Sequence, residues 1–253
     1  MRGRRPGWAA LFRELDADLW ALLLTREYDG YPGIRSVLPR VPEPELQARW
    51  NGVGGVALAA QGAAFYRRLR ERFEQRGDRP LEGARVLDFG CGWGRITRML
   101  ARDVAPERLF GCDPDEEILA VCRDNGVPGT FARSERVPDR LPFDGPFDLA
   151  LAFSVFTHLS EPAHDRCLRA LHVALRPGAV LVVTVRPPAY AELAGMPAGP
   201  GYAFAPHPGE EHYGEAIVPL PYVRKRWSDT FELLEADILL ADPFQLVLTL
   251  LRR

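Results

Sequence analysis

A chain of 253 residues, 47% of them hydrophobic, can bury one large core together with a smaller lobe. Its 32 basic and 34 acidic residues leave a formal net charge of −2, so no overall basic field favours nucleic acid as a partner. The four cysteines have no C-x-x-C spacing that would indicate a metal site, and we expect them to be reduced thiols.

The stretch Trp8–Leu24 is apolar, but four charged residues interrupt it: Arg13, Glu14, Asp16 and Asp18. It therefore fits neither a signal peptide nor a membrane span, and we expect a cytoplasmic protein without a membrane partner. Its leucines recur at helical spacing instead, which predicts a helix over residues 8–26.

Two more helices are predicted before residue 80, over Pro44–Trp50 and from about Val56 to Glu74. A proline-rich connector, Tyr28–Pro44, precedes the first of them, and the glycines of residues 51–55 separate the two. Residues 1–80 should thus form a helical N-terminal cap on the rest of the chain, which we treat as a core of residues 81–253.

From residue 84 onward, short apolar strands alternate with helices, a pattern typical of an α/β fold with a parallel sheet and helices on both faces. The expected strands are residues 84–88, 108–112, 129–132, 147–153, 179–185, 230–235 and 244–251. The expected helices are residues 95–102, 114–125, 161–175 and 221–227. Residues 186–220 form a long segment rich in Pro, Gly and His, and a loop of this length is usually functional.

A glycine-rich motif follows the first strand of the core. It reads Asp88-x-Gly90-x-Gly92-x-Gly94, and glycines at these positions allow a tight turn whose backbone N–H groups can face a ligand. A dinucleotide-binding turn, G-x-G-x-x-G, would need its third glycine at position 95, where this chain has arginine. The motif therefore disfavours an NAD-dependent oxidoreductase.

The motif resembles the first motif of class I S-adenosylmethionine (SAM) dependent methyltransferases. The resemblance implies that the loop passes beside the methionyl part of SAM and that Asp88 helps to hold its ammonium group, directly or through water. The loop residues expected at the cofactor are Gly90, Cys91, Gly92 and Gly94. The resemblance extends over residues 80–253 and implies a seven-stranded, mostly parallel sheet whose last strand is antiparallel.

Asp113 ends the second strand, where an acidic side chain can accept hydrogen bonds from both ribose hydroxyls of an adenosyl group. The alternative is a helix N-cap, because Pro114 is well suited to the first helical turn. Ser134 and Glu135, after the third strand, fall where class I methyltransferases place a polar residue against adenine, although they could equally form a plain turn.

Residues 147–159 resemble the fourth strand of this family and the loop behind it. Phe153 and Ser154 would flank the sulfonium of SAM, where an aromatic face could attract the positive charge. Phe156 could instead belong to the core. DNA amino-methyltransferases carry an Asn/Asp-Pro-Pro-Tyr string at this strand end, and its absence argues against a base as substrate.

Two histidines are candidate general bases, since imidazole can receive a proton near neutral pH. His158 follows the fourth strand, although it could merely cap or pack the next helix, and His212 lies in the segment 186–220. We favour His212 slightly, because Glu211 and Tyr213 beside it could orient its ring. Further polar residues of that segment are His207 and Glu210, and we expect no metal site there.

The sequence thus predicts a SAM-dependent methyltransferase that acts on a small hydroxylated molecule, such as a sugar or a specialised metabolite, with O-methylation favoured. Residues 186–220 would form a lid on the acceptor side. N- or C-methylation, or a SAM-binding enzyme that transfers no methyl group, stays open as an alternative, as does a homodimer. We expect neither nucleic acid nor a metal ion to take part.

Overall fold

The computed structural model describes residues 12–76, 78–197 and 199–253. The N-terminal part is helical, as predicted, with α2 (Ala17–Leu24), α3 (Pro32–Arg35), α4 (Pro44–Asn51) and α5 (Gly55–Arg76). The start of the helix expected over residues 8–26 lies outside the described residues. Trp20 of α2 is fully buried and donates from Nε1 to the carbonyl of Met99 at 3.0 Å, which attaches this part to the core.

The core is the predicted seven-stranded sheet. Its strands are β1 (Val86–Phe89), β2 (Leu109–Asp113), β3 (Thr130–Arg133), β4 (Phe147–Ala152), β5 (Leu175–Val185), β8 (Phe231–Leu239) and β9 (Asp242–Arg252). They lie in the order β3-β2-β1-β4-β5-β9-β8. β1 to β5 pair in parallel, and β9 is antiparallel to both of its neighbours. The prediction of one antiparallel final strand is therefore confirmed.

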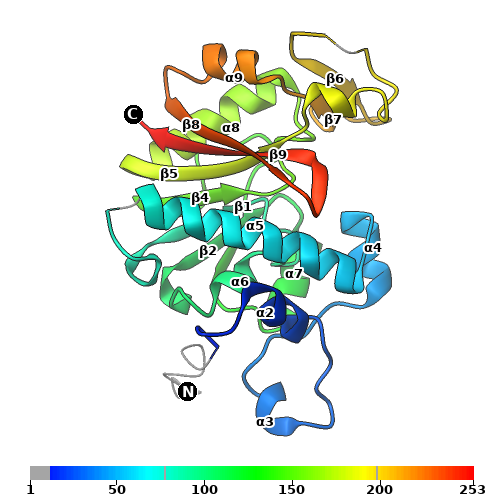
Figure 1. Ribbon diagram of the computed structural model, residues 1–253, viewed down its shortest axis with the longest axis vertical. Coiled ribbons are helices and arrows are strands. Elements are labelled where there is room, and N and C mark those ends of the chain that lie inside the picture. The colour runs from blue at the N-terminus through cyan, green and yellow to red at the C-terminus, as the bar shows by residue number, and fades with distance from the viewer. Residues whose placement is uncertain (1–11, 77, 198) are drawn as a thin grey trace.

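Helices cover both faces of the sheet, with α2, α5 and α6 (Thr97–Leu100) on one side and α8 (Glu161–Ala174) and α9 (Leu220–Arg226) on the other (Figure 1). Alternate residues of β4 supply the two cores because successive side chains of a strand point to opposite faces. Leu149 and Leu151 pack toward α5, whereas Phe147 and Ala150 pack toward α8. All four are fully buried, so the sheet is apolar on both faces.

Two helices begin later than the sequence predicts. The helix expected over residues 95–102 is only one turn, α6 (Thr97–Leu100), and the one expected from Pro114 starts at Glu116 as α7 (Glu116–Asp124). α7 begins there because Asp115 is its N-cap, with a side chain that accepts from the backbone N–H groups of residues 117 and 118. Pro114 therefore lies before the helix and leaves Asp113 outside the cap.

The described residues of the segment 186–220 form an insertion with secondary structure of its own rather than the plain loop that the sequence suggests. It contains a short 3₁₀ turn, η3 (Pro188–Tyr190), and a hairpin of β6 (Ala203–Pro206) with β7 (Gly214–Ile217). A side chain at Gly214 would come within 2.1 Å of the Ala205 carbonyl oxygen, so only glycine permits this pairing. Backbone hydrogen bonds of 2.8–3.0 Å join residues 212, 214 and 216 to residues 157–160.

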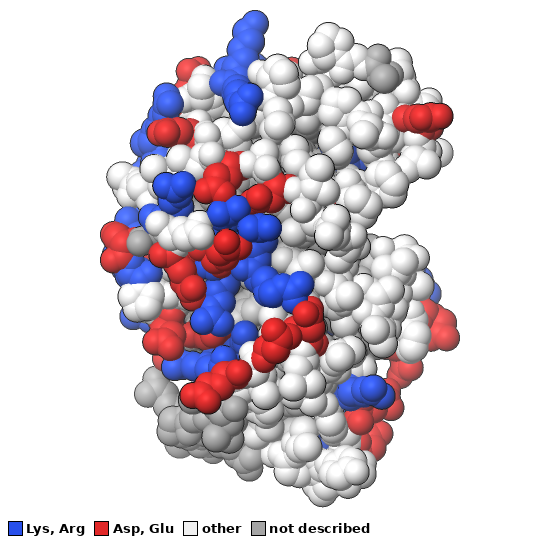
Figure 2. Space-filling model, in the orientation of Figure 1, with Lys and Arg blue, Asp and Glu red and all other residues white. Residues whose placement is uncertain are grey.

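The insertion and α4 lie on the same side of the molecule, with the β8–β9 turn between them (Figure 1). Figure 2 shows that this side is hollowed and mostly uncharged, whereas charged side chains gather on the opposite side of the view. Part of that charge is an ion-pair network between α5 and β8, formed by Arg68, Arg72, Arg76, Glu235 and Asp237. No helix in the described part of the chain is long and apolar enough to cross a membrane.

Candidate active site

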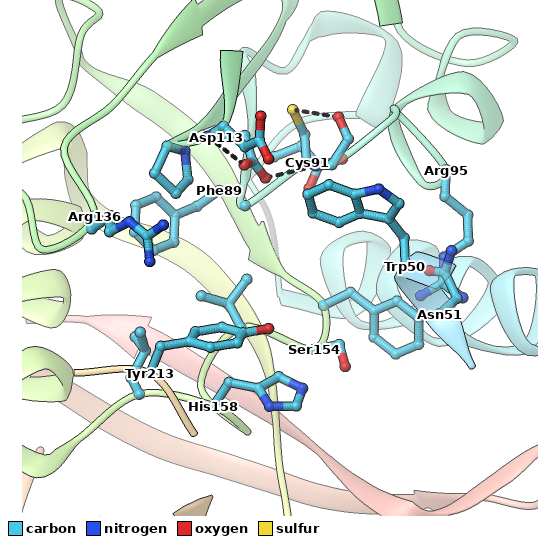
Figure 3. Close-up of a pocket in the computed structure, with 18 of the residues that line it drawn as sticks. Trp50, Asn51, Phe89, Cys91, Arg95, Asp113, Arg136, Ser154, His158 and Tyr213 are labelled. Atoms are coloured by element: carbon cyan, nitrogen blue, oxygen red, sulfur yellow. Dashed lines mark hydrogen bonds between the residues drawn. The ribbon is translucent and has the colours of Figure 1, made fainter. Parts of the chain in front are cut away.

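A cavity of about 880 Å³ opens at the carboxyl ends of β1, β2 and β4. Open α/β sheets bind their ligands at this edge, where the strand order changes direction. Asp113 and Cys91 lie on one side of the cavity and His158 and Tyr213 on the other (Figure 3). All of the predicted site residues line it except Gly94, and so do Arg95 and Glu210. The cavity is also lined by residues that the sequence did not single out: Trp50, Gln61, Arg136, Arg186, Tyr190, Asp242, Phe244 and Gln245.

The glycine loop has the backbone conformation that the motif predicts, with positive φ angles of 73°, 52° and 78° at Gly90, Gly92 and Gly94. A side chain at Gly90 would approach Val155 to 2.3 Å, and one at Gly94 would approach the thiol of Cys122 to 2.7 Å. Gly92 has no atom within 4 Å of such a position. The loop is therefore packed tightly behind Gly90 and Gly94 and open at Gly92, so a ligand can approach its backbone there.

Asp113 is almost fully buried at the end of β2, and each of its carboxylate oxygens accepts one backbone hydrogen bond. Gly92 N–H donates to Oδ2 at 2.9 Å, and Asp115 N–H donates to Oδ1 at 3.0 Å. The N-cap alternative for Asp113 is wrong, since Asp115 caps α7. A carboxylate has about four acceptor positions, so two remain for ligand hydroxyls. Burial raises the pKa of Asp113, while these two hydrogen bonds oppose the rise.

Asp88 is buried at the end of β1, and its Oδ2 accepts a hydrogen bond from the Thr97 hydroxyl at 2.6 Å. Burial raises the pKa of this carboxyl to about 6, and the charge of Asp113 nearby acts in the same direction. A carboxylate in such a place gains from a cationic ligand group, because the cation offsets the lost hydration. An ammonium group beside Asp88 would satisfy this condition.

Ser134 and Glu135 line the cavity next to Asp113, and the Ser134 N–H donates to the Asp113 carbonyl at 3.1 Å. Pro114 lines the same part of the cavity. These residues are the neighbours that an adenosyl group would have if its ribose bound Asp113.

Phe153 lines the cavity, but its ring has no open face for a cation. One face stacks on Phe65 with the ring centroids 4.3 Å apart, and the Arg95 guanidinium lies 4.5 Å from the Phe153 centroid. The expected attraction between this ring and the sulfonium is therefore wrong. Phe156 is fully buried against Trp227, which confirms the core alternative for it.

Ser154 has a positive φ of 63°, uncommon for any residue but glycine, and a polar network holds it. Its N–H donates to the Thr184 hydroxyl at 2.7 Å, and Gln245 Nε2 donates to its Oγ at 3.3 Å. Asp242 accepts from both Gln245 and Gln61, at 2.8 and 2.6 Å. One weak signal for this network is visible in the sequence, namely the polar residues Thr184 and Gln245 inside the apolar strands β5 and β9.

His158 has a fixed tautomer. Its Nδ1 lies 2.8 Å from the Gly214 carbonyl, and because a carbonyl can only accept, Nδ1 carries the proton. Nε2 has no protein hydrogen-bond partner within the described residues and is left as an acceptor. Burial lowers the pKa of His158, so the ring is neutral at physiological pH. His158 does not cap the following helix; its ring stacks beside Tyr213 with the centroids 5.2 Å apart.

His212 also lines the cavity, but Glu211 and Tyr213 do not orient it as we expected. Its Nδ1 lies 3.1 Å from the Ser160 hydroxyl, whereas its Nε2 is 3.9 Å from the exposed carboxylate of Glu211. Tyr213 stacks on His158 instead. Among the residues that the structure describes, no group of three or more His, Cys, Asp or Glu side chains is placed to hold a metal ion.

Comparisons with known proteins agree with this geometry. Residues 86–178 match a family model described as "Methyltransferase domain". Trans-aconitate 2-methyltransferase of Variovorax paradoxus is 31% identical over 125 residues, which are 46% of this chain and 47% of that protein. A ubiquinone biosynthesis O-methyltransferase of Rhizobium etli is 31% identical over 44% of each chain. The chain thus spans about half the length of the curated relatives it matches.

Solved structures share the fold. A SAM-dependent methyltransferase from Mesorhizobium loti superposes with a TM-score of 0.57 at 22% identity, over 76% of this chain and all of that one. Magnesium protoporphyrin IX methyltransferase from Synechocystis, solved with bound S-adenosylhomocysteine (SAH), superposes with a TM-score of 0.55 at 18% identity, over 78% and 86% of the two chains. Residues 86–178 thus match a methyltransferase domain, and the chain has the fold of these SAM-dependent methyltransferases.

Proposed function

We propose that the protein transfers the methyl group of SAM to a hydroxyl oxygen of a small molecule. One observation carries this proposal: a single cavity has the glycine loop and Asp113 on one side and a histidine with an available Nε2 on the other. The first side fits the cofactor, and the second side fits a group that must lose a proton.

The cofactor side matches the polar groups of SAM. Asp113 has free acceptor positions for the ribose hydroxyls, the backbone at Gly92 is open to the methionyl part, and Asp88 is the buried carboxylate that an ammonium would neutralise. When bound, SAM supplies an electrophilic methyl group on a positively charged sulfur. The protein then has to hold the acceptor in line with that methyl group and to keep water out.

The acceptor side favours oxygen over nitrogen or carbon. An alcohol is a poor nucleophile until its proton leaves, and Nε2 of His158 has a lone pair that can receive this proton. We therefore propose His158 as the base, because the Gly214 carbonyl holds its ring in place, and we keep His212 as the second candidate. The relative from Rhizobium etli is named as an O-methyltransferase, which supports the same choice.

N-methylation is the strongest alternative, because the fold accommodates it. A glycopeptide N-methyltransferase superposes with a TM-score of 0.52 at 14% identity. C-methylation and SAM-dependent reactions without methyl transfer use the same cofactor side and differ only in the acceptor. An NAD-dependent oxidoreductase is disfavoured by Arg95, which stands where the third glycine of a dinucleotide-binding turn would be.

We further propose the division of labour among the segments. Residues 1–80 act as a helical cap that contributes Trp50 to the cavity, and residues 186–220 act as a lid that contributes Tyr190 and His212. The acceptor is a sugar or a specialised metabolite, and the protein works in the cytoplasm in small-molecule biosynthesis, without nucleic acid, as a monomer or homodimer.

Mass spectrometry tests the proposal directly. The protein is incubated with SAM and a panel of sugars, phenols, hydroxy acids and amines, and the products are searched for a gain of one methyl group. Methylation of hydroxyl groups is the expected result. Methylation of amines alone would overturn O-methylation, and SAM consumption without any methylated product would point to one of the other SAM-dependent reactions.

A further inference from the structure

Glu215, which the sequence did not single out, sits behind His158 on β7. Its Oε1 is 3.5 Å from Nδ1 of His158 and 3.8 Å from Nε2 of His207. Its Oε2 is 2.9 Å from Nε of Arg186. The side chain is only 23% exposed, so these charges interact in a partly dry setting where they are screened less than at the surface.

The hairpin itself produces this contact. Gly214 accepts from His158 Nδ1 through its carbonyl, and the Gly214 N–H donates to the His158 carbonyl at 2.8 Å. The next residue along β7 is Glu215, whose carboxylate therefore arrives on the Nδ1 side of the same ring. Nε2, on the opposite side of the imidazole, is left for the acceptor.

We propose that Glu215 is a positioning residue for His158: its carboxylate holds the Nδ1 side of the ring and stabilises the positive charge that the ring acquires on accepting a proton. This rests on the proposed function. As the acceptor oxygen bonds to the methyl carbon, the carbon–sulfur bond breaks and its electron pair stays on sulfur. The hydroxyl proton moves to Nε2 of His158 and later leaves to water.

Burial opposes protonation of the ring most strongly, and four groups that face the ring modify this effect. The charge of Glu215 and the carbonyl of Gly214 favour the protonated ring, whereas Arg186 and His207 oppose it. Tyr213 stacks on the ring, and burial raises the pKa of its phenol, so it stays neutral. Glu215 is the one carboxylate in this set, which makes its removal the cleanest test.

The experiment is an NMR titration of the cofactor-free protein, in which the five histidines can be assigned by substitution. Glu215→Gln keeps the size of the side chain and removes the charge. An opposite charge at this distance shifts a pKa by about one unit or more, so the pKa of His158 should fall by about one unit. Glu211→Gln is the matched control on the same insertion, and it should leave His158 unchanged because Glu211 faces His212.

A second variant distinguishes an electrostatic effect on His158 from a change in folding. Arg186→Met removes the opposing charge and should move the pKa of His158 upward, in the direction opposite to Glu215→Gln. An unchanged His158 in Glu215→Gln, or shifts of the same sign in both variants, would overturn the proposal.

Kinetics provide the second readout. The acid limb of the kcat/KM profile should move to lower pH in Glu215→Gln, and the plateau of kcat should fall by roughly threefold, because a weaker base accepts the proton less readily. A structural role alone would lower the rate without moving the limb. If the NMR shifts appear but no acceptor is methylated, the proposed function fails while the pairing of Glu215 with His158 stands.

Discussion

The two sides of the cavity differ in how far apart their residues lie in the sequence. The cofactor side comes from residues 88–135, a continuous stretch that follows three neighbouring parallel strands. The acceptor side is assembled from four distant segments: the end of α4, the loop after β4, the insertion and the β8–β9 turn. The geometry of the cofactor side follows from local strand and turn conformation, whereas the geometry of the acceptor side depends on packing between distant segments. We therefore expect substitutions on the cofactor side to change the affinity for SAM, and substitutions on the acceptor side to change the rate of methyl transfer.

The largest expected effect is on the acceptor side. His158→Asn keeps a donor toward the Gly214 carbonyl but removes the base, so kcat should fall by about 10²–10⁴ while SAM affinity stays almost unchanged. Initial rates at saturating SAM, with calorimetry for affinity, measure both. His172→Asn is the control, because His172 packs on Phe231, away from the cavity. If His212→Ala causes the loss instead, the base is His212; if neither variant does, the acceptor is already nucleophilic.

The second effect is on stability. Burial gives Asp88 a pKa of about 6 in the folded protein, against 3.8 as its ordinary value. The folded state therefore binds this proton more tightly than the unfolded state, so ionisation destabilises the fold increasingly as pH rises from about 4 to 6 and fully above that. Asp88→Asn should raise the free energy of unfolding of the cofactor-free protein at pH 8 by on the order of 3 kcal/mol.

Urea unfolding at pH 4 and pH 8 checks this prediction, with the exposed Asp124→Asn as control. The increase in the free energy of unfolding of Asp88→Asn should be present at pH 8 and close to zero at pH 4. The same variant should bind SAM more weakly, since an amide does not neutralise an ammonium group. A variant that is less stable at pH 8 would show that Asp88 is held mainly by its bond to Thr97.

The third effect is on cofactor affinity. Asp113→Asn removes the carboxylate that we propose accepts hydrogen bonds from the ribose hydroxyls, and it should weaken SAM binding by about 2 kcal/mol, or roughly 30-fold. The value of kcat at saturating SAM should change little. Calorimetric titration measures the dissociation constant, again beside Asp124→Asn. An unchanged affinity in a folded Asp113→Asn protein would mean that this carboxylate serves only its backbone contacts with Gly92 and Asp115.

The smallest expected effect comes from breaking an ion pair that joins the cofactor side of the cavity to the insertion. Nη1 of Arg136, after β3, lies 3.1 Å from both carboxylate oxygens of Glu210 in the insertion, and the pair is exposed. Exposed pairs contribute about 1 kcal/mol or less, so Arg136→Ala should change SAM affinity by less than about fivefold. Limited proteolysis should cut residues 186–220 faster in this variant, and SAH with acceptor should slow the cutting.

The matched control is Arg166→Ala, which breaks a similar exposed pair with Asp139 away from the insertion. Equal cutting of residues 186–220 with and without ligands would count against their role as a lid.

The residues of the cofactor side are close in the chain, which is why the sequence could predict that they would lie together at one cavity. The glycine spacing and the strand ends placed Asp88, Gly92 and Asp113 together without any knowledge of distant contacts. His158 was placed near the same strand ends because it follows β4 directly, although the sequence slightly favoured His212 as the base. The start of α7 was missed because the capping strength of Asp115 outweighs the preference of Pro114 for a first helical turn.

The acceptor side could not be predicted in this way. Gln61 bonds to Asp242 across 181 positions, and neither residue belongs to a recognisable motif. Glu215 was missed because nothing in the sequence pairs β7 with the loop after β4; only the hairpin brings its carboxylate to His158. The cation role of Phe153 failed for a similar reason, since Phe65 and Arg95 arrive from α5 and the glycine loop to cover its ring.

The central claim is that the cavity binds SAM through the stretch from Asp88 to Glu135. Calorimetric titration of the unmodified protein with SAM, SAH and NAD tests it most directly. We expect SAM and SAH to bind at one site and NAD to bind far more weakly or not at all. Tighter binding of NAD than of SAM would contradict this account of the site.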